Sequence, residues 1–189
     1  MTAGNFSVTA WGSVDFAATG YKEMDLTLTY TLGPVAFSLT DLWESGNTDC
    51  SGSISRNYFH FGADSPHRIE AGIAWRISQR VPVTLSWNTV LFGTIDKNSE
   101  GEHAYATYLE ASYPFRVKDV DMQAGVGVVP WNAYATYGAD RDFYVQNVFL
   151  NAGKSWTVAK SLQLGIFTNL SWNPALEDVN FVGGISLRM

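Results

Sequence analysis

Hydrophobic and polar residues alternate along most of the chain with a period of two, not the 3.6-residue period of a helix. Met24, Leu26 and Leu28, for example, alternate with Asp25 and Thr27. Such alternation predicts strands with one apolar and one polar face. The pattern predicts ten strands, over residues 5–16, 21–32, 34–43, 67–77, 81–92, 103–115, 120–130, 143–156, 161–173 and 178–189. No segment predicts a helix.

The length of these strands and the character of their apolar face indicate a membrane protein. They are about 10 to 13 residues long, whereas ordinary strands have about 5–6 and a tilted strand that crosses a bilayer needs about 9–11. The apolar face carries almost no charge, as lipid contact requires, while a soluble barrel has an apolar interior and a charged exterior. We therefore expect an all-β fold, an antiparallel transmembrane β-barrel of about ten strands.

The connections between the strands favour the same architecture. Tight turns alternate with long loops over 44–66, 93–102 and 131–142, although the connections over 17–20 and 174–177 are short and fall on the long-loop side. Short turns at one end and long loops at the other are typical of outer-membrane barrels. Residues 57–61 have strand-like composition, and we place them within the first long loop, where they form a hairpin of their own if they pair at all. Aromatic residues gather near the strand ends, as expected of two interfacial girdles.

Composition narrows the function classes. The 189 residues are 46% hydrophobic and only 16% charged, against about 25% charged in an average domain. This excludes a disordered chain, and the formal net charge of -6 argues against nucleic acid as a partner. Cys50 is the single cysteine, so it forms no intrachain disulfide and no thiolate metal cluster. We expect one domain over residues 1–189.

Several short motifs resemble the TorF family of porins, which are Gram-negative outer-membrane proteins. The motifs are Ala10-Trp11-Gly12-Ser13, Lys22-Glu23-Met24-Asp25-Leu26, Tyr30-Thr31-Leu32-Gly33, Thr40-Asp41, Thr107-Tyr108-Leu109-Glu110, Tyr113-Pro114-Phe115, Asn173-Pro174, Glu177-Asp178 and Gly183-Gly184-Ile185-Ser186. The resemblance implies a porin-like role but names no substrate. It also implies twelve strands for a full family member, since such members carry a further hairpin before the Ala-Trp-Gly segment.

Charged residues on the polar strand faces are the candidate functional residues. Strand parity directs them toward the lumen of the expected barrel: Asp15, Glu23, Asp25, Glu70, Arg76, Glu110, Asp121 and Arg188. Charges of both signs either line a water path and set ion selectivity or pair and plug a narrow interior. Because carboxylates outnumber arginines in this set, an open path is expected to favour cations.

Enzymatic and metal chemistry find little support in the sequence. His60, His67 and His103 lie in or beside long loops without a metal-ligand spacing, so we expect solvated surface histidines and no metal. No Gly-x-Ser-x-Gly motif occurs, and no histidine sits in the middle of a strand on the lumen face. We therefore expect no enzyme, no catalytic residues and no cofactor.

The sequence thus predicts a porin-like barrel in the outer membrane. Its partners are outer-membrane lipids and the ions or small polar solutes that diffuse through it. Two alternatives stay open: a closed structural or accessory barrel without transport, and a soluble β-barrel binding module.

Overall fold

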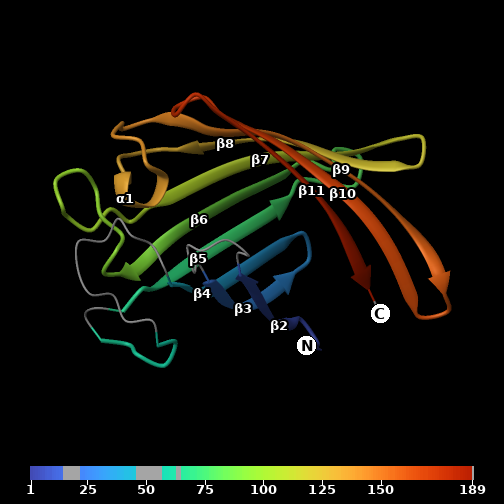
Figure 1. Ribbon diagram of the computed structural model, residues 1–189, viewed down its shortest axis with the longest axis horizontal. Helices are drawn as coiled ribbons and strands as arrows, with labels where there is room; N and C mark the ends of the chain where they lie inside the picture. The colour runs from blue at the N-terminus through green and yellow to red at the C-terminus, as the bar shows by residue number, and fades with distance from the viewer. Residues whose placement is uncertain (15–21, 46–56, 63–64, 189) are drawn as a thin grey trace.

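A computed structural model describes residues 1–14, 22–45, 57–62 and 65–188. These residues form one antiparallel sheet of eleven strands, in which each strand pairs with its neighbours in the sequence (Figure 1). The strands are β1 (Thr2–Ala3), β2 (Phe6–Val14), β3 (Lys22–Leu32), β4 (Val35–Ser45), β5 (His67–Arg76), β6 (Thr84–Gly93), β7 (Thr107–Val117), β8 (Val120–Val129), β9 (Tyr144–Ala159), β10 (Leu162–Asn173) and β11 (Asp178–Arg188). The expected all-β antiparallel fold is confirmed, and ten of these strands match the predicted ones.

Most tight turns lie at one end of the strands and the long connections lie at the other (Figure 1). The turn over 174–177, between β10 and β11, is an exception, because it is tight and lies at the end of the long connections. Gly33 and Lys118 turn the chain between β3 and β4 and between β7 and β8, with φ of 56° and 55°. Glycine adopts this left-handed conformation at no steric cost, which explains the presence of Gly33 in the turn between β3 and β4. The long connections after β6 and β8 gather at the other end, together with the single helical turn α1 (Tyr134–Tyr137).

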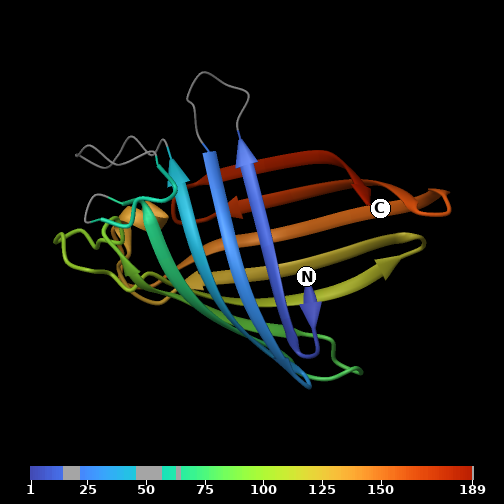
Figure 2. The same cartoon turned by 90° about the horizontal axis from the view of Figure 1, so that it is seen from below.

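The two faces of the sheet differ in chemistry and in exposure. On one face Leu28 pairs with Leu39, and these side chains are 45% and 48% exposed. On the other face Thr27 pairs with Thr40, and their hydroxyls lie 3.1 Å apart. The polar face is the more crowded one, since a Cβ at Gly72 would come within 2.4 Å of a serine hydroxyl there. The polar face is therefore the concave side of a strongly twisted sheet, as the steep crossing of the first and last strands in Figure 2 indicates.

The sheet is not closed into a barrel. In the described part of the chain no hydrogen-bonded ladder joins β11 to β1 or β2. The unpredicted strand β1 instead covers one end of the free β2 edge. There the Val8 N–H donates to the Met1 carbonyl, and the Met1 ammonium donates to the Val8 carbonyl, both at 2.8 Å. Barrel closure is thus not shown by this structure.

Residues 57–61 lie outside the strands and contain a turn, in agreement with their placement in the first long loop. Two further details differ from the expectations. The strand expected from residue 103 begins at Thr107, because residues 94–106 fold back on themselves through the isolated bridge between Lys97 and His103. The helical turn α1 was not predicted, and it ends at Gly138, whose φ of 77° allows a left-handed cap. No helix in the described ranges is long and apolar enough to span a membrane.

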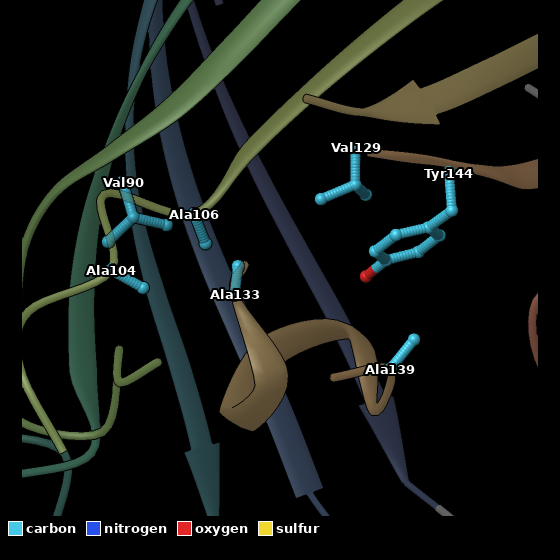
Figure 3. Packing of buried hydrophobic residues seen from close by; sticks show 7 residues of the cluster. All are labelled: Val90, Ala104, Ala106, Val129, Ala133, Ala139 and Tyr144. Atoms are coloured by element: carbon cyan, nitrogen blue, oxygen red, sulfur yellow. The ribbon is translucent and has the colours of Figure 1, made fainter. Parts of the chain in front are cut away.

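The one cluster of buried hydrophobic residues among those described is small and lies at the loop end. It consists of Val90, Ala104, Ala106, Val129, Ala133, Ala139 and Tyr144. Figure 3 shows Ala133 near Ala106, and Ala139 near Tyr144, where the α1 segment packs on the sheet. Among the described residues, the body of the sheet therefore has no buried apolar cluster beneath it, and most of its large apolar side chains point the other way.

Candidate functional site

The candidate charged residues lie on the polar face of the sheet. Strand register places seven of them there: Glu23, Asp25, Glu70, Arg76, Glu110, Asp121 and Arg188. Asp15 lies outside the described residues. Glu70, for example, pairs with Thr40, and Glu110 pairs with Ser86, so each carboxylate has a polar neighbour on the next strand. Whether this face lines a lumen stays a prediction.

These charges fall into two groups along the strands, with Glu23 in the loop-end group and the exposed Arg76 in the turn-end group. Asp25, Glu70 and Glu110 are half-buried in the middle or toward the loop end of their strands. Asp121 and Arg188 are exposed at the turn end, where they border one hollow of about 240 Å³. Asp121 there lies 3.2 Å from Arg116 in an exposed ion pair. Because both side chains of this pair are exposed to water, the pair contributes only about 0–1 kcal/mol to stability.

A buried ion pair between Arg68 and Glu44 was missed at the sequence level. The Arg68 guanidinium contacts the Glu44 carboxylate on the polar face, and Arg68 is only 8% exposed. Arg68 shares the parity of Glu70 and Arg76, so the alternation itself contained the signal. Glu44 was placed in a loop, whereas β4 extends to Ser45. The pair neutralises one carboxylate close to Asp25, which lies across the ladder from Leu42.

A wholly buried carboxylate holds the α1 segment against the loop end of the sheet. Asp96 is 0% exposed and accepts hydrogen bonds from the Ala106 N–H at 3.2 Å and the Thr136 hydroxyl at 3.1 Å. The Nδ1 atom of His103 lies 3.2 Å from the same carboxylate. Buried charges persist where such partners compensate for lost hydration. Asp96 thereby joins the loop after β6 to α1.

A polar cavity of about 390 Å³ lies between α1 and the concave face. Its walls come from β5, β6, β7, β9, β10, β11 and α1: Glu70, Asn88, Tyr108, Tyr137, Gln146, Asn147, Ser171, Asn173, Asp178 and Asn180. Burial raises the pKa of the Tyr137 hydroxyl, and the charge of Glu70 raises it further. Tyr137 therefore stays a neutral donor at ordinary pH.

Two glycines of β8 make room for aromatic side chains on the polar face. A Cβ at Gly127 would lie 1.9 Å from the Tyr108 hydroxyl oxygen, and one at Gly125 would lie 2.3 Å from the Phe149 ring. The Tyr108 hydroxyl donates to Glu110 at 3.2 Å. The sequence showed small residues at these positions, but only the fold shows which rings cover them.

An irregularity in β9 adds a side chain to the cavity wall. Gly127 pairs with Asn147 and Val128 pairs with Val145, so Gln146 is the extra residue of a β-bulge. A bulge changes the direction of a side chain and locally breaks the alternation. Gln146 and its neighbour Asn147 therefore both border the cavity.

His67 does not match the expectation of solvated histidines, because it is 8% exposed. Its Nδ1 lies 2.7 Å from an Asp41 carboxylate oxygen, and its Nε2 lies 2.7 Å from the Tyr58 carbonyl oxygen. The Phe61 ring stacks on the imidazole at 4.3 Å. Residues 58–61 thus cover the apolar face at the loop end, which the sequence pattern did not predict.

Among the described residues, no group of three or more His, Cys, Asp or Glu side chains is placed so that it could hold a metal ion. Cys50 lies outside those residues.

Comparison with known proteins adds no relative: no family model, curated protein or solved structure matches the chain.

Proposed function

We propose that the protein is an outer-membrane β-barrel through which ions or small polar solutes diffuse passively, with a preference for cations. The polar face would line the pathway and the apolar face would contact lipid. Closure would join β2 to β11, which run in opposite directions because eight strands separate them in an antiparallel meander.

The observation that carries this proposal is the exposed apolar face. Large hydrophobic side chains are exposed along strand after strand, among them Leu26, Leu28, Leu39, Ile73, Leu85, Trp87, Val126, Leu150, Ile166 and Leu170. Soluble monomers rarely expose continuous apolar patches above a few hundred Å². Strands β3 to β11 have 10 to 16 residues, enough for a tilted crossing of the bilayer.

The charge of the polar face supports cation preference. Its carboxylates outnumber its guanidinium groups: Glu23, Asp25, Glu44, Glu70, Glu110, Asp121 and Asp178 stand against Arg68, Arg76, Arg116 and Arg188 among the described residues. Fixed charges in a narrow pathway act strongly on passing ions, because little water screens them.

The test is the reversal potential across a planar bilayer under a salt gradient. We expect a cation preference that weakens in the double variant Glu70→Gln with Glu110→Gln. A matched control, Glu100→Gln with Glu102→Gln, removes the same charge from an exposed loop and should leave selectivity close to that of the parent. An anion preference, or equal effects of both double variants, would contradict the role given to the polar face.

A closed barrel without transport is the second candidate, and the packing of α1 and the Arg68–Glu44 pair on the polar face favour it. Complete absence of conductance from correctly folded protein would select it. A folded monomer that stays monodisperse without detergent would instead select a soluble binding module.

A further inference from the structure

The polar cavity under α1 is lined almost entirely by neutral hydrogen-bonding groups. Four asparagines, one glutamine, one serine and two tyrosines face it, together with the carboxylates of Glu70 and Asp178. No lysine, arginine or histidine belongs to this wall as far as the structure describes it. Its volume of about 390 Å³ falls in the range of about 300–1,000 Å³ usual for small-molecule sites.

Hydrogen bonds between wall residues, one from β10 to β9 and one within β11, orient part of this wall in advance. The Ser171 hydroxyl donates to the Asn147 amide oxygen at 2.6 Å, and the Asn180 amide donates to Asp178 at 2.8 Å. Each of these groups keeps further donor or acceptor capacity, because an amide has two N–H groups and two oxygen lone pairs. Held in this way, they cost a ligand little ordering entropy.

One buried group of the wall has no partner in the described structure. The side-chain oxygen of Gln146, on the β9 bulge, is buried and accepts no hydrogen bond. An unsatisfied buried acceptor is unfavourable, so rotation of the Gln146 amide toward the cavity, where its oxygen would accept from a ligand hydroxyl, would be favoured. The bulge therefore presents an acceptor suited to a bound donor.

From these groups we infer that the cavity binds a neutral polyhydroxylated solute, a sugar of one or two rings. Its hydroxyls would donate to Glu70, Asp178 and Gln146 and accept from the asparagine amides. The rings of Tyr108 and Tyr137, with centroids 6.3 Å apart, offer apolar surface to the C–H groups of a sugar ring. Anions are disfavoured because both fixed charges are negative. The passage of this solute through the protein rests on the proposed function, whereas its binding in the cavity does not.

The test is calorimetric titration of detergent-solubilised protein with glucose and maltose. We expect saturable binding of at least one of them, and about tenfold weaker binding of glucuronate than of glucose, because its carboxylate meets Glu70 and Asp178. Gln146→Met keeps the length of the side chain and removes the amide, and should weaken binding about three- to tenfold.

The control is Gln163→Met, which makes the same change on the polar face at the turn end, outside this cavity. It should leave the affinity within twofold of the parent, and circular dichroism should show that both variants keep their strands. Absence of binding by both sugars, or equal losses in the two variants, would overturn the inference. Conductance without sugar binding would refute this site and leave the proposed pathway intact. Sugar binding without conductance would support this site and refute the proposed pathway.

Discussion

At the scale of single residues, close packing on the polar face depends on positions that carry no side chain. Gly127 lies directly beneath the Tyr108 ring, and Tyr108 in turn contacts Glu110 and borders the cavity. The preference for glycine here comes from space, since Gly127 has no left-handed φ that would require it. Gly127 on β8 thus determines the position of the Tyr108 side chain on β7, which forms part of the cavity wall.

Replacing Gly127 with alanine should therefore destabilise the fold and displace Tyr108. The new methyl group would meet the phenol, and such overpacking costs about 1–3 kcal/mol. Urea unfolding of the protein reconstituted with lipid vesicles measures the change in unfolding free energy. Gly12→Ala is the matched control, because the nearest atom to its Cβ is 3.5 Å away, an ordinary contact. Adding Tyr108→Ala to the Gly127→Ala variant should relieve the clash, and failure to do so would contradict this explanation.

Tyr58 allows a second residue-level prediction, based on ionisation. Burial raises the pKa of its hydroxyl above the ordinary value of about 10, and the negative charge of Asp41 and the hydrogen bond to it at 3.4 Å raise it further. The folded state thus favours the neutral phenol. Its contribution to stability is complete below about pH 10 and is lost as the pH rises through the folded-state pKa.

The measurement is the tyrosinate absorbance of the parent minus that of Tyr58→Phe, followed through alkaline pH. The difference curve should have its midpoint above about 10, and the 57–62 segment should become sensitive to protease only at higher pH. A midpoint at or below the ordinary tyrosine value would show that Tyr58 does not lie against Asp41.

At the scale of elements, α1 is held by tertiary contacts and not by its own helix propensity. It has only four residues, no side-chain cap and no charged residue that favours its ends. A single turn is unstable alone, because helix nucleation is unfavourable. Its position comes from the Thr136 hydrogen bond to Asp96 and from the Ala135 N–H, which donates to the Lys97 carbonyl at 3.0 Å.

Asp96→Asn should loosen this element. The amide can place only one oxygen toward the donors, so a buried N–H or hydroxyl loses its partner, at about 1–3 kcal/mol. We expect faster proteolysis within residues 130–143 and, if α1 narrows the pathway, larger and noisier single-channel currents. Asp142→Asn, a change at an exposed position of the same connection, should alter neither. Unchanged proteolysis in Asp96→Asn would show that other contacts hold α1.

At the scale of the whole molecule, the sheet is inverted relative to a soluble β protein. Its apolar side chains are exposed on the convex face, and its buried cluster is confined to one end. In water such a surface drives association, whereas in a bilayer it is covered by lipid. We therefore expect the sheet to associate with other copies in water and to stay dispersed in a bilayer.

Arginine substitutions on the two faces of β6 test whether the apolar face contacts lipid. Leu85→Arg places a charge on the apolar face, at a cost of about 2–4 kcal/mol if that face meets the bilayer midplane. Ser86→Arg places it on the polar face beside Glu110 and should cost less. The yield of folding into lipid vesicles measures both. Equal yields, or a lower yield for Ser86→Arg, would contradict the assignment of the apolar face to lipid.

The strands and their faces were predictable because both depend on local pattern. Alternation at residues such as Leu26 and Leu28 determines the apolar face within one strand, and turn residues such as Gly33 determine where the strand ends. Seven of the eight candidate charges lie on the expected polar face for this reason, and Asp15 lies outside the described residues.

The tertiary structure alone decided what lies over those faces. Asp96 meets Thr136 across forty positions of the chain, and His67 is buried by Tyr58 and Phe61. The bulge at Gln146 breaks the period on which parity depends. The pairing of β1 with the β2 edge was likewise not predictable, because the two residues of β1 are too few to show alternation. Alternation determines the direction of a side chain from its own strand, whereas burial, cavities and closure depend on contacts between strands and loops far apart in the sequence.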